Sequence, residues 1–386
     1  MSKLLRGLGF LGLVGAVAFT ATACSNKKTT TKKDSTTKTT TDVVTTAAPK
    51  KDYGELKVSI PTGIIRTSLD IIAIQKGFFE EEGVKVTGVN IKGMDALTAL
   101  NTNSKDLDLL TLAFVPDVQA ISNGYDNIRF IGGTAVEGGA LIAKKGSADQ
   151  YKDTTTKINF DKIKGAKLGF AVGEAAWVVT NQYLIENDTT YSAGSYKSLD
   201  ITNLKDEQTV AQLVGNGQIE VGFLPLEYAN LYKDAYGVEI IVAAGDLIPE
   251  YVCCRQATSS EKLAAKKDAF LAYEKGRLRA WEYISNEANR NDVVKTIADY
   301  IKKEEDYVSN YLYGGITKWS VDPNKKGIVT YTAALKNADV LKNEISDISS
   351  YVDITIYEEA LTELKERYSN VQFYKDKYDL FTTYNK

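Results

Sequence analysis

The order of short apolar strands and helices limits this chain to a small set of folds. Strands and helices alternate over residues 55–131, and the first strand is the alternating segment 56–60. The same alternation restarts at Lys167, after a polar stretch over residues 147–157. This order is typical of mostly parallel sheets with helices on both faces. The sequence therefore predicts an α/β fold in which a second unit is inserted into the first.

The chain becomes helical after Arg255. Apolar residues then recur at helical spacing. Helices are expected over residues 261–289, 292–301, 304–312 and 357–368. We expect this helical C-terminal extension to pack back onto the first lobe.

Length and composition exclude several classes of protein. Residues 53–386 exceed the usual size of one hydrophobic core, so two lobes are expected. The formal net charge is −3, and the basic residues near the N-terminus leave the rest of the chain more acidic. An acidic body makes nucleic acid an unsuitable partner. The chain has no histidine, which excludes an imidazole base and any histidine-containing metal site.

The N-terminus has the pattern of a signal peptide. Lys3 and Arg6 precede an apolar run over residues 7–19, which is shorter than the roughly 20 residues of a membrane-spanning helix. Small residues then lead to Cys24. Residues 1–23 resemble a bacterial lipoprotein signal, which implies lipidation of Cys24. An ordinary secretory signal with an incidental cysteine is the alternative.

A tether is expected after the signal. Residues 24–52 consist almost entirely of Thr, Lys, Ser, Asp and Ala and contain no aromatic residue. Such a segment cannot bury enough apolar surface to offset its conformational entropy, so we expect it to be disordered. The sequence therefore predicts an extracytoplasmic body held at a cell membrane by a lipid anchor, at the outer face of the cytoplasmic membrane or in the periplasm.

Four segments in order resemble one family of binding proteins. They are residues 78–86 (FFEEEGVKV), 96–108, 165–173 and 217–222. Together they resemble the solute-binding proteins of ABC transporters for nitrate, sulfonate, taurine and thiamine precursors. The resemblance implies a two-lobed type II periplasmic-binding-protein fold, with two crossover segments and a ligand in the cleft between the lobes.

The resemblance also implies an organisation and a function. The first lobe is expected over residues 53–143, the second over 144–249, and the hinge return, the rest of the first lobe and the C-terminal helices over 250–386. The protein is then a monomeric receptor without a cofactor or metal. It binds a small molecule and delivers it to the permease and ATPase subunits of an importer, and it is not an enzyme.

The ligand is expected where strands end. In open α/β sheets, ligands bind beyond the carboxyl ends of strands, where helix N-termini offer free N–H groups. The candidate ligand-binding residues are Thr62, Gly63, Ala113, Phe114, Thr134, Glu174, Ala175, Trp177, Leu224 and Arg255.

Several of these residues have two interpretations. Trp177 either stacks on a ligand or packs in the core, and Glu174 either faces the cleft or only complements the helix dipole. Arg255 either grips an anion or forms a structural ion pair at the hinge. Cys253 and Cys254 alternate faces if they lie in a strand, and we interpret them as small buried residues rather than a redox or metal site.

Two ligand classes and two other functions stay open. A sulfonate-like or taurine-like anion would use Arg255, whereas a thiamine-precursor-like heteroaromatic would use Trp177, Phe114 and Glu174. A surface adhesin or sensor with the same fold is the alternative from another class. The resembling family also includes pyrimidine-precursor synthases, but those draw on a histidine that this chain lacks.

Overall fold

The computed structural model describes residues 51–386, apart from residues 92, 112–113 and 172. The expected signal peptide, the expected lipidation site Cys24, nearly all of the expected tether and the candidate residue Ala113 lie outside this part of the chain. Within it, no helix is both long and apolar enough to cross a bilayer.

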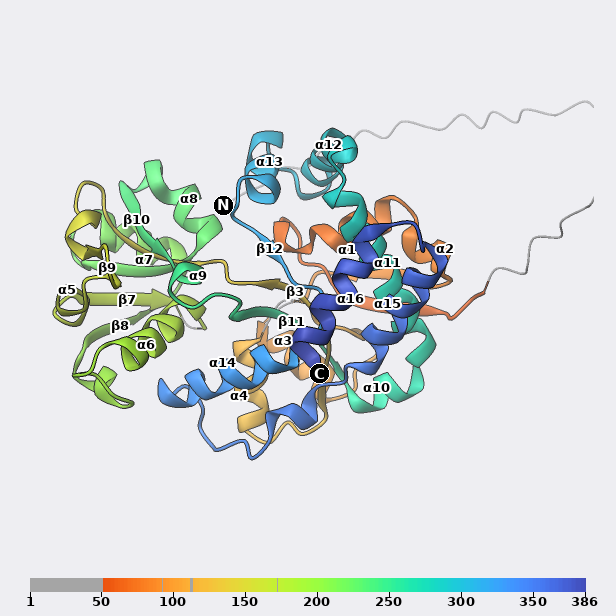
Figure 1. Ribbon diagram of the computed structural model, residues 1–386, viewed down its shortest axis with the longest axis horizontal. Helices are drawn as coiled ribbons and strands as arrows, with labels where there is room; N and C mark the ends of the chain where they lie inside the picture. The colour runs from red at the N-terminus through yellow and green to blue at the C-terminus, as the bar shows by residue number, and fades with distance from the viewer. Residues whose placement is uncertain (1–50, 92, 112–113, 172) are drawn as a thin grey trace, which may run out of the picture. The chain divides into compact units, whose positions relative to one another are not determined.

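The first lobe begins with two parallel strands and their helices (Figure 1). Leu109 continues the parallel arrangement with a single bridge to Val58. The elements of this lobe are β1 (Glu55–Ser59), α1 (Ser68–Gln75), α2 (Phe78–Glu82), β2 (Lys85–Val89), α3 (Gly93–Asn101) and α4 (Val115–Ser122).

The second lobe contains a five-stranded sheet in the order β10-β4-β9-β7-β8. Strand β7 is parallel to β8 and β9, whereas β4 is antiparallel to β9 and β10. Helix α6 covers one face, and α7 and α8 cover the other (Figure 1). The elements are β4 (Gly139–Lys144), β5 (Lys152–Asp153), β6 (Lys157–Ile158), α5 (Phe160–Lys164), β7 (Lys167–Ala171), α6 (Ala175–Asn187), β8 (Asp200–Leu204), α7 (Glu207–Gly215), β9 (Val221–Pro225), α8 (Leu226–Ala235), β10 (Val238–Ala243) and α9 (Ala244–Leu247).

This architecture is the two-lobed α/β fold that the alternating pattern predicts, with parallel strands in both lobes. One boundary differs from the sequence-based division. Strand β4 pairs with β9 and β10, so residues 139–143 belong to the second sheet.

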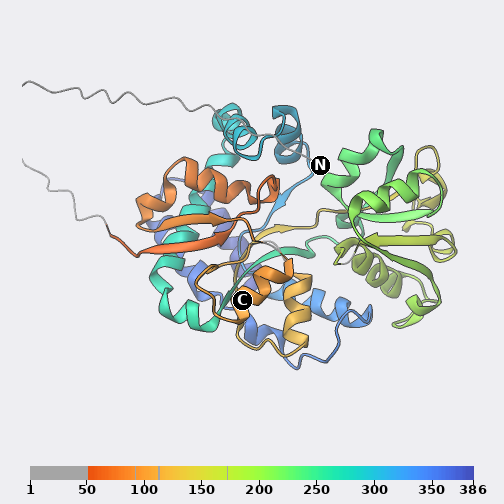
Figure 2. The ribbon, with the colours of Figure 1, turned by 180° about the vertical axis from the view of Figure 1, so that it is seen from behind.

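Two long strands connect the lobes. Strands β3 (Ile128–Val136) and β11 (Val252–Ser259) run antiparallel beside each other, and β12 (Lys318–Trp319) pairs with the other edge of β3. Seen from behind in Figure 2, both strands span the space between the first lobe and the five-stranded sheet, β3 leading into the second lobe and β11 leading back. These strands are therefore the hinge of the molecule.

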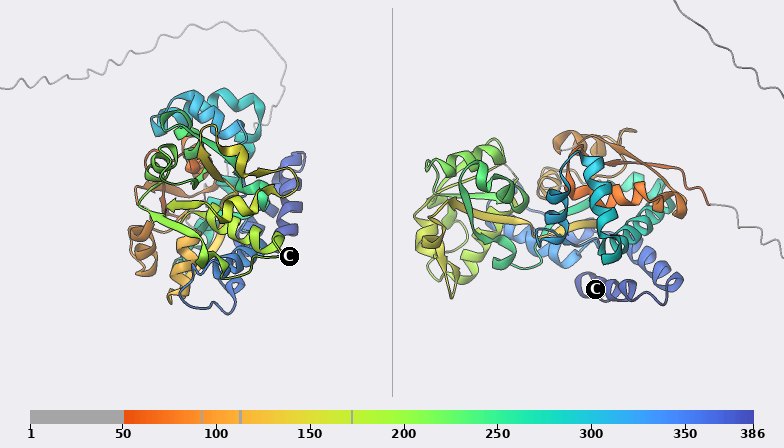
Figure 3. Two further views of the ribbon diagram at one scale, coloured as in Figure 1. Left: turned by 90° about the vertical axis from the view of Figure 1, so that its left-hand side faces the viewer. Right: turned by 90° about the horizontal axis from the view of Figure 1, so that it is seen from above.

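The chain after β11 is helical. Helices α11 and α15 pack on each other in the first lobe, and α15 and α16 lie side by side (Figure 3). Helix α14 contacts α6 of the second lobe, where the Tyr331 hydroxyl donates to the carbonyl of Ala175 at 3.1 Å. These elements are α10 (Ser260–Ala265), α11 (Lys267–Ser285), α12 (Arg290–Ile301), α13 (Glu305–Tyr313), α14 (Lys325–Asn337), α15 (Thr355–Arg367) and α16 (Gln372–Asn385).

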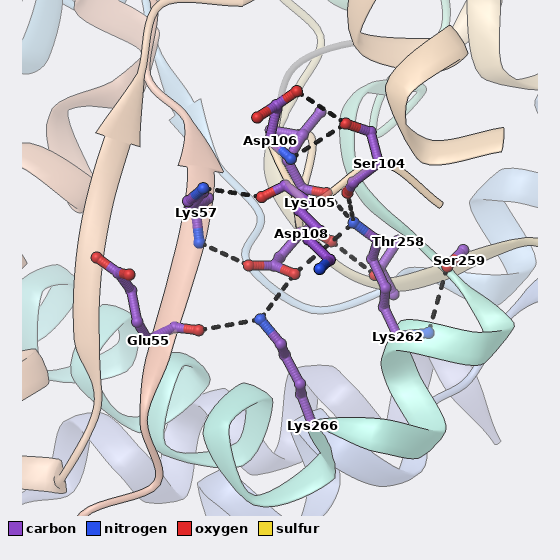
Figure 4. A network of polar contacts seen from close by, with 11 residues as sticks. Glu55, Lys57, Ser104, Lys105, Asp106, Asp108, Thr258, Ser259, Lys262 and Lys266 are labelled. Carbon is purple, nitrogen blue, oxygen red and sulfur yellow. Dashed lines mark hydrogen bonds and ion pairs between the residues drawn. The ribbon is translucent and has the colours of Figure 1, made fainter. Parts of the chain in front are cut away.

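A buried carboxylate links the first strand, β1, to strand β11 and helix α10. Asp108 accepts the backbone N–H of Lys57 at 2.8 Å and binds the Lys266 ammonium at 2.9 Å. Its carbonyl accepts the Thr258 hydroxyl at 2.7 Å, and the Lys262 ammonium lies 3.7 Å from its carboxylate (Figure 4). The network therefore holds β1, α10 and β11 of the first lobe together.

Arg255 anchors the crossover strands. The pairing of β3 with β11 is irregular on both sides of Cys254 and again after Gln256. The fully buried Arg255 guanidinium donates to the carbonyls of Ala135 and Asp322, each at 2.7 Å. Gly133 makes room for it, because a Cβ there would lie 2.2 Å from Arg255 Nη1.

The hinge therefore depends on Arg255. In Arg255→Met, two buried carbonyls lose charge-assisted hydrogen bonds, so we expect the free energy of unfolding to fall by about 3 kcal/mol. Urea denaturation of the full-length protein measures this loss. The matched control is Arg290→Met, whose guanidinium is 40 % exposed beside Glu287, and we expect at most about 1 kcal/mol there. Equal losses in both variants would contradict the assignment.

Candidate functional site

A cavity of about 210 Å³ lies between the two lobes, at the ends of strands and the starts of helices. The first lobe contributes Arg66 and the start of α4, the connection between β3 and β4 contributes Gly138, and β11 contributes Cys253. The second lobe contributes the starts of α6 and α7 and the end of β9. Drug-sized ligands occupy roughly 300–1,000 Å³, so this cavity suits a small solute.

An ion pair crosses this cavity from lobe to lobe. Arg66 lies in a short 3-10 turn (Ile65–Thr67) of the first lobe, and Glu227 lies in the first turn of α8 in the second lobe. Arg66 Nε is 2.8 Å from Glu227 Oε2, with side chains 19 % and 11 % exposed. Burial opposes the charge of the guanidinium, but Glu227 together with Cys253, Cys254 and Tyr311 outweighs it, so the pKa of Arg66 is raised.

Glu174 begins helix α6 on the other side of the cavity. Gly173 has a φ of 84°, which turns the chain out of β7, and Glu174 then caps the helix. Its Oε1 accepts the backbone N–H of Ala176 at 2.8 Å. Burial, together with the negative charges of Glu207 and Glu227, raises the pKa of Glu174 from 4.5 to about 7.

The balance of charge at the site is negative. Glu174 and Glu207 line the cavity and Glu227 reaches it through its ion pair, whereas Arg66 is the one cationic residue of the cavity lining within the described part. Glu227 pairs directly with Arg66, and among the described residues neither Glu174 nor Glu207 has an ion pair of its own. The arrangement can accept hydrogen bonds from N–H groups and can stabilise a cation.

Two thiols complete the floor of the cavity. The sulfurs of Cys253 and Cys254 are 3.5 Å apart, and Arg66 Nη1 lies 4.0 and 3.9 Å from them. The hydrogen bond with Cys253, supported by the charge of Arg66, lowers the pKa of Cys254 to about 6. The same hydrogen bond, together with burial, raises the pKa of Cys253.

Three of the sequence-predicted residues line this cavity. They are Phe114, Glu174 and Ala175. All three precede or begin helices that follow strands, which is the position from which they were selected.

The other candidates in the described part of the chain lie elsewhere. Thr134 and Leu224 are fully buried, and the Thr134 hydroxyl donates to the Thr111 carbonyl at 3.0 Å. Trp177 stacks on Phe170 in the second lobe, with ring centroids 5.6 Å apart. Arg255 is buried at the hinge, with its donors on carbonyl oxygens. Thr62 and Gly63 lie on the loop after β1, outside the cavity lining.

The sequence-based selection missed Arg66, Glu207, Glu227 and the thiol pair as site residues. Glu207 and Glu227 occupy the first turns of α7 and α8, and acidic residues there usually complement a helix dipole. One sequence feature could have indicated Glu207 and Glu227: both lie at the starts of helices that follow strand ends, which is where ligands bind in open α/β sheets. Nothing in the sequence places Arg66 against a residue 161 positions away.

The raised pKa of Glu174 predicts a pH-dependent stability. The folded protein holds its proton up to about pH 7, whereas the unfolded chain releases it near 4.5, so burial of Glu174 costs stability as the pH rises through this window. Glu174→Gln keeps the helix cap and removes this cost. We expect the variant to match the parent near pH 4.5 and to exceed it by about 3 kcal/mol above pH 7.

Urea denaturation of the two full-length proteins between pH 4.5 and 8 tests this expectation. The difference in free energy of unfolding should grow with pH. Two curves that stay parallel across the whole range would show that Glu174 titrates normally.

Comparison with known proteins identifies the family. Residues 59–298 match the NMT1-like family. No curated protein sequence matches the chain significantly.

Solved structures share the fold at low sequence identity. The nitrate-binding protein NrtA from Synechocystis PCC 6803 has a TM-score of 0.62 at 13 % identity, over 81 % of this chain and 89 % of that one. The alkanesulfonate-binding protein SsuA from Xanthomonas axonopodis pv. citri, bound to MOPS, has a TM-score of 0.58 at 17 % identity, over 80 % and 99 %.

A ligand-binding component of an ABC-type import system from Staphylococcus aureus, solved with zinc, has a TM-score of 0.60 at 14 % identity, over 80 % of this chain and 99 % of that chain. The family match covers more than half of the chain, and these structures share its two-lobed architecture. The chain therefore belongs to the NMT1-like family and has the periplasmic-binding-protein fold.

Proposed function

We propose that this protein is the solute-binding receptor of an ABC importer. It binds a small molecule between its lobes, closes around it and presents the closed form to a membrane permease and its ATPase. The observation that carries the proposal is the cavity between the lobes, to which both contribute charged side chains and helix N-termini. Family membership and the solved ABC-import binding proteins of the same fold support it.

The charges of the cavity favour a nitrogenous ligand over a bare anion. Nitrate or a sulfonate would meet the uncompensated carboxyl groups of Glu174 and Glu207, and the one guanidinium nearby is already paired with Glu227. An amine or an amino-substituted heterocycle would instead donate N–H groups to these carboxylates. Arg255 is the other residue that the sequence offers for binding an anion. Its guanidinium instead donates hydrogen bonds to backbone carbonyls at the hinge.

Binding and closure are coupled through the ion pair across the cavity. Arg66 moves with the first lobe and Glu227 with the second, so their contact favours the closed arrangement. A bound ligand adds further contacts between the lobes. It donates hydrogen bonds to carboxylates of the second lobe and touches Phe114 of the first lobe. Closure then needs no bond chemistry, only contacts that exist in the closed form alone.

The location of the receptor follows from its N-terminus. Lipidation of Cys24 and the tether behind it would hold the body near the outer surface of a membrane, within reach of a permease. Binding proteins of the same fold, described as periplasmic, support an extracytoplasmic location.

A thermal-shift screen of the full-length protein tests the ligand class. The probes are 4-aminopyrimidines, simple amines, nitrate and alkanesulfonates. A ligand at about 100 times its dissociation constant adds roughly 2.7 kcal/mol to stability, and we expect this from an amino heterocycle or an amine. A shift with nitrate or a sulfonate alone would contradict the ligand class but not the receptor function.

Carboxylate variants locate the binding site. Glu174→Gln and Glu207→Gln should each weaken binding of the stabilising compound at least tenfold, because each loses a charge-assisted hydrogen bond of about 1.5–3 kcal/mol. The control is Glu186→Gln, an exposed carboxylate at the far end of the same helix as Glu174. Equal affinities in all three variants would place the ligand elsewhere. Each shift is measured against the ligand-free form of the same variant.

The ion pair across the cavity predicts a change in compactness. Glu227→Gln removes the carboxylate that holds Arg66, so the ligand-free protein should open more often and its radius of gyration should rise in small-angle X-ray scattering. Glu344→Gln, which breaks the exposed pair with Lys336 within the C-terminal segment, serves as the control. Identical radii for both variants and the parent would show that the pair does not hold the lobes together.

A further inference from the structure

Two neighbouring thiols face the same space at the start of β11. Consecutive strand residues normally point to opposite faces of a sheet. Here the pairing of β11 with β3 shifts register on both sides of Cys254, and the two sulfurs come within 3.5 Å of each other. The irregular strand therefore converts an alternating pair into a dithiol.

The dithiol belongs to the wall of the cavity. Both Cys253 and Cys254 line it, with Cys253 half-buried and Cys254 only 1 % exposed. Arg66 Nη1 lies within 4.0 Å of both sulfurs, so a guanidinium covers the pair from the cavity side. A positive charge at this distance favours the thiolate, which is the reactive form of cysteine.

The geometry argues against a disulfide between these two residues. Adjacent Cα atoms are about 3.8 Å apart across a trans peptide, whereas disulfides usually need about 4.4–6.8 Å. A structural metal site also lacks ligands, because no group of three His, Cys, Asp or Glu residues in the described part of the chain could hold an ion. The two sulfurs could instead bind one electrophilic atom that forms a bond to each of them and needs no third protein ligand.

We propose that Cys253 and Cys254 form a bidentate thiol site on the cavity wall, which takes thiophilic electrophiles of the trivalent organoarsenical class. The adduct itself requires only the two thiols. Its position on the path of the transported solute rests on the proposed function.

The reaction balances without an oxidant. An organoarsenical of the form R–As=O loses its oxygen, and two S–As bonds form, one to each cysteine. The two thiol hydrogens leave with that oxygen as one molecule of water, and arsenic stays trivalent. Where Cys254 starts as the thiolate, the second proton comes from solvent.

Mass spectrometry of the intact protein with phenylarsine oxide tests the site. The test uses the full-length protein with the substitution Cys24→Ser, because Cys24 is the one other cysteine in the sequence. We expect one arsenical per protein molecule, with both thiols lost to a thiol-specific dye. An excess of a 1,2-dithiol should remove the arsenical, whereas the same concentration of a monothiol should not, because only the dithiol restores two-point attachment.

Single-cysteine variants separate one-point from two-point attachment. Cys253→Ala and Cys254→Ala should lose the arsenical on the order of 100-fold faster than the parent, because a second attachment within one molecule raises the effective concentration. Circular dichroism shows that each variant is folded. Absence of the adduct from the parent, or equal retention by the parent and both variants, overturns the proposal. Neither result bears on solute binding, which the thermal-shift screen measures independently.

Discussion

The paired crossover strands β3 and β11 are the constraint on which the rest of the structure depends. Both lobes are attached to them, and the cavity lies where they enter the second lobe. Their pairing is irregular, and the guanidinium of Arg255 donates to the carbonyl of Ala135 on β3 and to that of Asp322, which follows β12. Gly133 is required at the same point, because a side chain there would occupy the position of this guanidinium. The same irregularity turns Cys253 and Cys254 towards one side.

The electrostatics of the cavity follow from where the helices begin. Helices α6, α7 and α8 start at one edge of the second sheet, and each carries a carboxylate in or before its first turn. Such residues are favourable neighbours of a helix N-terminus. Gathered around one small cavity, they also repel one another, and burial keeps Glu174 partly protonated near neutral pH. A ligand that donates hydrogen bonds relieves this repulsion, whereas an anion adds to it.

Much of the fold and part of the site could be predicted from the sequence. The alternation of strands and helices indicates the two α/β lobes, because periodicity and chain order depend on local residues. The rule that ligands bind at strand ends selects Phe114 and Glu174, which line the cavity. Arg66 and Glu227 could not be paired in advance, since their contact depends on how the lobes close. The sequence leaves Arg255 with two interpretations, an anion contact or a structural role at the hinge, because no sequence pattern reveals the register shifts beside it.

The central claim is that a nitrogenous solute binds between the lobes and is held by carboxylates of the second lobe. A crystal structure of the full-length protein with a stabilising amino heterocycle tests this claim most directly. The account predicts ligand density in the cavity, with N–H groups within hydrogen-bond distance of Glu174 or Glu207. Density at any other position, or a ligand held by Arg66 through an anionic group with Glu227 displaced, would contradict it.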